Sequence, residues 1–253
     1  MFDQLDMFDT ASSRQVGDRQ IDIEQLIAEA AASTSVLIGC ETSGTVRDAF
    51  ARLGYDVWSC DLLPADDRTN RHIQDDVRNV MASQHWDLIC IMHPPCTRLC
   101  NSGVRWLSKP PPNKTLDDMH RELRESVELF SDCWNHDTPC LAIENPVMHK
   151  HAKALIRNYQ PFSQSVQPWQ FADSDSSADN VKKRTCFWNR NLPDLRPTGQ
   201  LTGKTARADC HNASPSKDRW KIRSKFHVGM AEAMAQQWGS HASSVRASTC
   251  SAC

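Results

Sequence analysis

The chain has 253 residues, of which 40% are hydrophobic and 24% are charged, and its formal net charge at pH 7 is −2. This composition excludes wholesale disorder and collagen-like sequence, and the length is enough to bury the core of one α/β domain. No apolar stretch approaches the ~18–20 residues that cross a bilayer, and the first residues are acidic where a signal peptide is basic. We therefore expect a cytoplasmic protein with no membrane partner.

The charge is divided unevenly along the chain. Residues 1–80 carry 7 Lys and Arg against 15 Asp and Glu, whereas residues 181–225 carry 12 against 3. A basic excess interleaved with aromatic side chains suits a surface that faces phosphates, so this segment favours a nucleic-acid partner, with a solvated lysine-rich loop as the alternative. The 11 cysteines are odd in number and irregularly spaced, which predicts reduced thiols.

Strand-like and helix-like patterns alternate after a flexible polar leader at residues 1–20. Strands are expected at residues 35–38, 55–60, 72–75, 87–92, 140–143, 164–169 and 184–188. Helices are expected at residues 21–32, 46–53, 116–134 and 229–238, and a flexible tail at residues 241–253. This alternation predicts a single domain over residues 21–240, built on a mostly parallel sheet with helices on both faces.

Polar residues follow several of the expected strands, and the carboxyl ends of parallel strands line the ligand crevice of an open α/β sheet. The first strand ends in a turn from Gly39 to Gly44, the usual place for a nucleotide-like cofactor, although Gly44 could equally mark only the start of a helix. Asp61 and Asp76 end the next two strands, where a carboxylate can hold ribose hydroxyls.

Two further strand ends carry groups that suit covalent catalysis. Cys96 lies in Pro94-Pro95-Cys96, where a thiol at the mouth of the crevice could act as a nucleophile, with an inert buried cysteine as the alternative. Glu144 follows the strand at residues 140–143, and burial could keep its carboxyl protonated and able to donate to a ring nitrogen. Glu144 could equally be a helix-capping acid.

Metal-dependent chemistry has to be weighed because His93, Cys96 and Cys100 lie close together. A zinc nucleobase deaminase needs a His-x-Glu and a Pro-Cys-x-x-Cys, and this chain has neither in the required order. A structural metal held by Cys96, Cys100, Cys210 and His211 stays open on spacing alone, but the sequence does not favour it and we expect no metal site.

In this order the motifs resemble the cytosine carbon-5 DNA methyltransferase family, in particular its short members from phages and prophages. The likeness runs from about Val36 to Trp238, and its most specific part is Pro-Pro-Cys96 followed by Glu144-Asn145. It implies a Rossmann-like fold that binds S-adenosylmethionine. The residues that the resemblance assigns to the cofactor are Gly39, Cys40, Glu41, Ser43, Gly44, Asp61, Leu62, Asp76, Val77 and Pro94.

The resemblance also implies a mechanism. A cysteine in the position of Cys96 attacks carbon 6 of cytosine while a glutamate in the position of Glu144 protonates ring nitrogen 3, and the resulting enamine attacks the methyl group. Asn145 belongs to the same motif as Glu144, and residues 229–235 resemble the family's last helix, which packs beside the cofactor. The target base has to leave the duplex stack to reach these groups.

The chain departs from the family in two ways. The arginine-rich strand motif is represented by Lys182-Lys183-Arg184 with its basic residues displaced, and we assign the base-contacting cation to Arg184. Only about 40 residues separate Phe187 from the final helix, fewer than the ~50 of a separate domain. A basic loop at residues 189–226 therefore stands in place of a target-recognition domain, and we expect low sequence specificity for DNA.

The expected function is methyl transfer to carbon 5 of cytosine in DNA, in the cytoplasm of a bacterial host. Two alternatives stay open: the same chemistry on a free cytidine nucleotide or RNA, and a catalytically idle member that binds DNA or the DNA polymerase sliding clamp. The leader is similar to the peptide by which bacterial replication and repair proteins dock on that clamp, although it could instead pack on its own domain. The peptide residues are Gln4, Leu5, Asp6, Met7 and Phe8.

Overall fold

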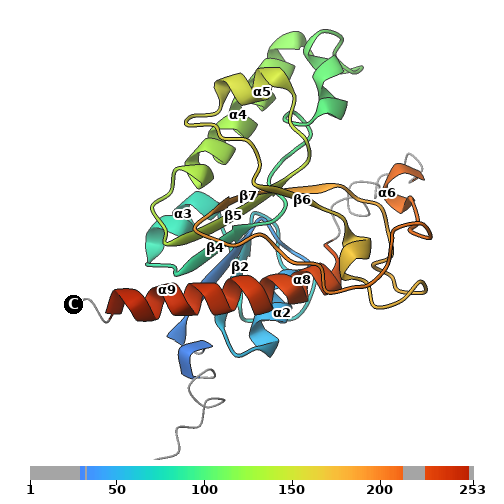
Figure 1. The fold of residues 1–253 in the computed structure, drawn as a ribbon. Coiled ribbons are helices and arrows are strands. Elements are labelled where there is room, and N and C mark those ends of the chain that lie inside the picture. Colours follow the sequence, from blue (N-terminus) through green and yellow to red (C-terminus); the bar gives the residue numbers. More distant parts are fainter. Residues whose placement is uncertain (1–28, 32, 213–225, 251–253) are drawn as a thin grey trace, which may run out of the picture.

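The computed structural model describes residues 29–31, 33–212 and 226–250 (Figure 1). The predicted leader, most of the helix expected at residues 21–32 and residues 213–225 of the predicted basic loop lie outside the described residues. The same holds for the side chains of Cys210 and His211, which complete the metal site that the spacing left open. In the part of the chain that the structure describes, no helix is long and apolar enough to cross a membrane.

The described residues form one sheet of seven strands in the order β3-β2-β1-β4-β5-β7-β6. The strands are β1 Ser35–Gly39, β2 Asp56–Asp61, β3 His72–Gln74, β4 Leu88–Ile91, β5 Cys140–Asn145, β6 Gln164–Val166 and β7 Thr185–Arg190. Strands β1 to β5 pair in parallel, and β7 is antiparallel to both of its neighbours. The mostly parallel sheet is confirmed, and the order of its first five strands is compatible with a Rossmann-like fold.

Helices cover both faces of this sheet, as expected (Figure 1). The helices are α2 Thr45–Arg52, α3 Val77–Ser83, α4 Leu116–Trp134, α5 Lys150–Leu155, α6 Asp209–Asn212, α8 Val228–Met234 and α9 Ser240–Cys250. Shorter turns are the 3-10 helices η1 Asn101–Leu107 and η2 Pro168–Phe171 and the π-helical turn η3 Ala235–Gly239. The strand expected over residues 164–169 is shorter because Pro168, which has no backbone N–H, begins η2.

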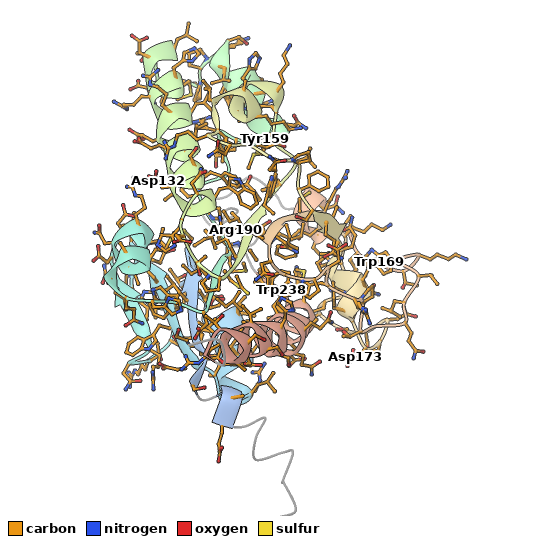
Figure 2. All side chains as sticks on the ribbon, turned by 60° about the vertical axis from the view of Figure 1, so that its left-hand side comes forward. Asp132, Tyr159, Trp169, Asp173, Arg190 and Trp238 are labelled. Carbon is orange, nitrogen blue, oxygen red and sulfur yellow. The ribbon has the colours of Figure 1, made fainter. Side chains whose placement is uncertain are left out.

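Two apolar clusters, one on each face, hold the helices against the sheet. Ile38 of β1 belongs to the cluster with Phe50 of α2 and Trp238 of η3, whereas its neighbour Leu37 belongs to the cluster with Phe130 of α4. Trp238 is fully buried beside the closing helices (Figure 2). Since successive side chains of a strand point to opposite faces, a strand buried on both faces needs the continuous apolar run seen in the sequence.

The C-terminal segment corrects one prediction, because residues 241–250 belong to helix α9 and are not a flexible tail. Ala242 is buried, the hydroxyls of Ser243 and Thr34 lie 2.9 Å apart, and Arg246 Nη1 donates to the buried Asp87 carboxylate at 3.0 Å. These contacts join α9 to the amino-terminal ends of β1 and β4. The helix escaped prediction because the side chains that attach it are small or polar and give no apolar periodicity.

Candidate active site

The candidate site lies at the carboxyl ends of β1 to β4, where the strand order reverses between β1 and β4. A cavity of about 530 Å³ opens there, a volume typical of small-molecule sites. Five of the residues predicted to hold a cofactor line it, namely Cys40, Asp61, Leu62, Asp76 and Val77. The remaining walls come from residues that the sequence did not single out for the cofactor, including Asp75, Arg78, His93, Pro95, Arg98, Glu122 and Glu125.

The turn after β1 is tight, which explains its glycines. A Cβ on Gly39 would lie 2.6 Å from side-chain atoms of Ile91 and Val77, so a larger residue would push β4 and α3 away. Gly44 adopts φ +69°, a left-handed conformation that favours glycine, and Cys40 between them has φ 57°. This backbone brings Cys40 to the cavity wall, whereas Gly44 begins α2 and lies outside the lining.

Glu41 and Ser43 have a structural task in that turn. The buried Glu41 carboxylate accepts hydrogen bonds from the backbone N–H of Val46 at 2.8 Å and of Arg47 at 3.1 Å, and from the Ser43 hydroxyl at 3.2 Å. Burial raises the pKa of Glu41 in spite of these bonds. Neither residue lines the cavity, so Glu41 fixes the start of α2 and shapes the turn from behind.

Asp61 and Asp76, near the ends of β2 and β3, both line the cavity but differ in the hydrogen bonds that their carboxylates already accept. The Asp61 carboxylate accepts a hydrogen bond from Leu63 N at 2.9 Å. Asp76 caps α3 by accepting from Arg78 N at 2.9 Å, and the side chain of Arg78 also bonds to it, which lowers the pKa of Asp76. Asp61 therefore keeps more accepting capacity for a ligand hydroxyl than Asp76 does.

Cys96 is half-buried in the loop after β4, between two cavity-lining residues, Pro95 and Thr97. Its carbonyl accepts from Cys100 N at 3.0 Å, which closes a turn that brings the two side chains together. The hydrogen bond to the Cys100 side chain, with burial adding to it, raises the pKa of Cys96. The same bond, helped by the Ser102 hydroxyl 3.1 Å from Cys100 Sγ, lowers the pKa of Cys100.

Glu144 is buried at the end of β5, beside the strand that leads to Cys96. Burial raises the pKa of Glu144 to about 7, and the charge of Lys183 opposes this shift. The carboxyl also acts on Cys96, since its negative charge contributes to the raised pKa of that thiol. The structure thus brings the predicted nucleophile and the predicted proton donor into one electrostatic environment. A carboxyl with this raised pKa can hold its proton at a higher pH than an ordinary glutamate.

His93 is a site residue that sequence reasoning considered only as a metal ligand. Its Nδ1 lies 3.8 Å from Glu144 Oε2, and burial lowers the pKa of His93 to about 3, so the ring is neutral. Its Nε2 is buried and has no hydrogen-bond partner among the described residues. The sequence signal that could have identified His93 as a site residue is its position at the start of the His-Pro-Pro-Cys turn, directly after a strand.

The structure separates the other two predicted catalytic residues from Glu144. Asn145 is fully buried, but consecutive residues of a strand point to opposite faces, so it cannot share the surroundings of Glu144. Arg184 donates to Ser165 Oγ at 3.0 Å and is exposed to solvent. The cation whose charge acts on Glu144 and on His93 is Lys183 instead of Arg184.

Pro94, the last predicted cofactor residue, does not line the cavity, whereas its neighbours His93 and Pro95 do. Among the side chains that the structure describes, no group of three or more His, Cys, Asp or Glu is arranged to hold a metal ion. The eight cysteines in this set are all free.

Comparison with known proteins adds no assignment. No protein-family model matches the chain, and a search of curated proteins finds no match either. What this site does must therefore be inferred from its own geometry and chemistry.

Proposed function

We propose that this protein transfers a methyl group from S-adenosylmethionine to carbon 5 of cytosine in DNA. The observation that supports this most is that a buried Glu144 of pKa about 7, at the end of β5, acts through its charge on Cys96 in the loop after the adjacent strand β4, next to a cavity. A nucleophile and a proton donor are the two groups that make carbon 5 of cytosine reactive. On this proposal the sheet is a Rossmann-like methyltransferase fold.

The size and charge of the cavity support S-adenosylmethionine as the cofactor. Its acidic side chains are Asp61, Asp75, Asp76, Glu122 and Glu125, against two basic ones, Arg78 and Arg98. An acidic lining suits ribose hydroxyls and a cationic ligand and disfavours phosphates. Asp61 would hold the ribose, and Val77 would pack against the adenine. When bound, the cofactor supplies an electrophilic methyl group.

Cys96 has to lose its proton before it can attack, because the thiolate is the nucleophile. In the resting pair the proton lies on Cys96, because their hydrogen bond raises the pKa of Cys96 and lowers that of Cys100, so the Cys100 thiolate must accept this proton before Cys96 attacks. The Cys96 thiolate then adds to carbon 6 of the base. This route requires no histidine base, which agrees with the low pKa of His93.

Glu144 supplies the matching proton to ring nitrogen 3 as the thiolate adds. Its carboxylate is then left buried, and the charge of Lys183 stabilises it. The neutral His93 lies beside Glu144 and lines the cavity, so it adds no charge near the proton donor.

The proposal is tested by incubating the protein with radiolabelled S-adenosylmethionine and, separately, duplex DNA, single-stranded DNA, RNA and dCMP. We expect label in DNA, with several sequences labelled at comparable rates. Label found only in dCMP or RNA would support the proposed chemistry and would show that the substrate is not DNA. Cofactor binding without label on any substrate would point to the idle alternative.

A further inference from the structure

The loops that carry Cys96 and Glu144 are paired directly with each other. The carbonyl of Leu99 accepts from His149 N at 2.9 Å, and the carbonyl of Val147 accepts from Asn101 N at 3.2 Å. An antiparallel bridge between Cys100 and Met148 completes the pairing. The position of the Cys96 loop is therefore set relative to the turn that follows Glu144.

The side chain of His149 adds a second link between the two loops. The ring is buried, its Nδ1 accepts from the backbone N–H of Ala152 at 3.0 Å, and its Nε2 lies 2.7 Å from the carbonyl oxygen of Arg98. Because Nδ1 accepts a bond from an N–H, the proton of the neutral ring lies on Nε2, which donates to Arg98. The ring thus spans from the start of α5 to the Cys96 loop.

We propose that His149 is a positioning residue that fixes the placement of Cys96 relative to Glu144 through its bond to the Arg98 carbonyl. The inference rests on the proposed function. Arg98 is two residues from Cys96, and its side chain donates to Glu122 on the cavity wall at 2.7 Å. A shift of about 1 Å in the position of a reacting group can reduce a rate by ~10²-fold, so the loss of this bond should slow transfer.

Two substitutions separate the two bonds of the ring. His149→Asn places an amide oxygen where Nδ1 lies, so it keeps the cap of α5 but cannot reach Arg98. His149→Gln can carry its amide nitrogen toward the Nε2 position, so it keeps the bond to Arg98 and loses the cap. His151→Asn is the matched control, because His151 is exposed in the first turn of α5 and its ring centroid lies 5.8 Å from that of His149.

The first measurement is the single-turnover rate of methyl transfer with cofactor binding measured in parallel. We expect His149→Asn to slow transfer by roughly tenfold or more and His149→Gln by less than about threefold, with the cofactor Kd changed less than about twofold in either. The opposite order, or equal rates in both variants, would overturn the proposal. A His149→Asn protein that fails to fold would also overturn it in favour of a structural role.

The second measurement does not depend on methyl transfer. Alkylation of Cys96 by iodoacetamide, followed by peptide mass spectrometry, reports how firmly the loop holds the half-buried thiol. We expect the rate to rise at least about threefold in His149→Asn and to stay near the wild-type rate in His149→Gln and His151→Asn. If the wild type transfers no label at all, the proposed function fails, yet these alkylation rates still decide whether His149 holds the loop.

Discussion

At the scale of single residues, the proposed nucleophile Cys96 can be tested most directly. We expect Cys96→Ser to abolish transfer while cofactor binding stays nearly intact, because a serine hydroxyl is a far weaker nucleophile at neutral pH. Cys100→Ser in the same loop is the control, and it should slow transfer without abolishing it. Label transfer and equilibrium dialysis of the cofactor are the measurements. Wild-type activity in Cys96→Ser would make Cys96 structural.

Glu144 should give the reaction its pH dependence. The carboxyl must be protonated to donate, and burial raises its pKa to about 7, so the rate should fall as the pH rises through about 7. Glu144→Gln should reduce the rate by ~10²-fold and remove this fall. A reduction of less than tenfold in single-turnover assays would exclude Glu144 as the proton donor.

The same pKa shift predicts a stability effect. A buried carboxyl with a pKa raised from 4.5 to about 7 destabilises the folded state once the pH exceeds 4.5, since the unfolded chain ionises more readily. Glu144→Gln carries no such charge, so its free energy of unfolding relative to the wild type should rise by roughly 2 kcal/mol between pH 5 and pH 8. Urea unfolding at both pH values measures this. A constant difference would contradict the raised pKa.

Lys183 and Arg184 are neighbours with different predicted effects. Lys183 lowers the pKa of Glu144, so Lys183→Ala should move the alkaline fall in rate to higher pH. Arg184→Ala should leave the pH profile unchanged, because the Arg184 side chain bonds to Ser165. Profiles of the single-turnover rate for both variants test the assignment. If the pH profile shifted in Arg184→Ala and not in Lys183→Ala, the cation of the site would be Arg184, as predicted from the sequence.

The closing helix α9 is the feature to test at the scale of elements. Asp87 is buried, and although burial opposes it, hydrogen bonds from Ser35 and Arg246 lower the pKa of Asp87. Arg246→Ala leaves this carboxylate without its cation and should reduce the free energy of unfolding by ~1–2 kcal/mol. Ser248→Ala, at an exposed position of α9, should stay within ~0.5 kcal/mol of the wild type. Equal unfolding midpoints in urea for both variants would mean that the bond between Arg246 and Asp87 contributes nothing to stability.

At the scale of the whole molecule, the leader predicts a partner for the protein. Leu5, Met7 and Phe8 are large apolar side chains in a polar segment, and a groove on the sliding clamp would bury them. These residues lie outside those that the structure describes. A labelled peptide of residues 1–12 should bind purified bacterial clamp saturably and lose binding when Leu5 and Phe8 are replaced with alanine. Absence of binding at ~100 μM clamp, or about −5.5 kcal/mol, would make the pattern a coincidence.

The positions of the strands along the chain and the ends of the longest helix could be predicted from the sequence because the signals are local. Helix α4 begins at Thr115, whose side chain accepts from Asp118 N while Asp118 accepts from Thr115 N, and this capping box can be recognised from four consecutive residues. The ends of β2, β4 and β5, near Asp61, Cys96 and Glu144, were likewise marked by an apolar run followed by polar residues. The short helices α3 and α5 carry too little periodicity to be seen this way.

Tertiary structure decided what each side chain at those ends can do. Glu41 caps α2, Lys183 and not Arg184 acts on Glu144, and His149 bonds to Arg98, 51 residues away. The sequence by itself determined where the strands lie and end, because strand length and alternation are properties of neighbouring residues. Direction, burial and pKa depend on segments that meet only in the folded chain. Electrostatic and hydrogen-bond partners come from those segments, so no local pattern could assign them.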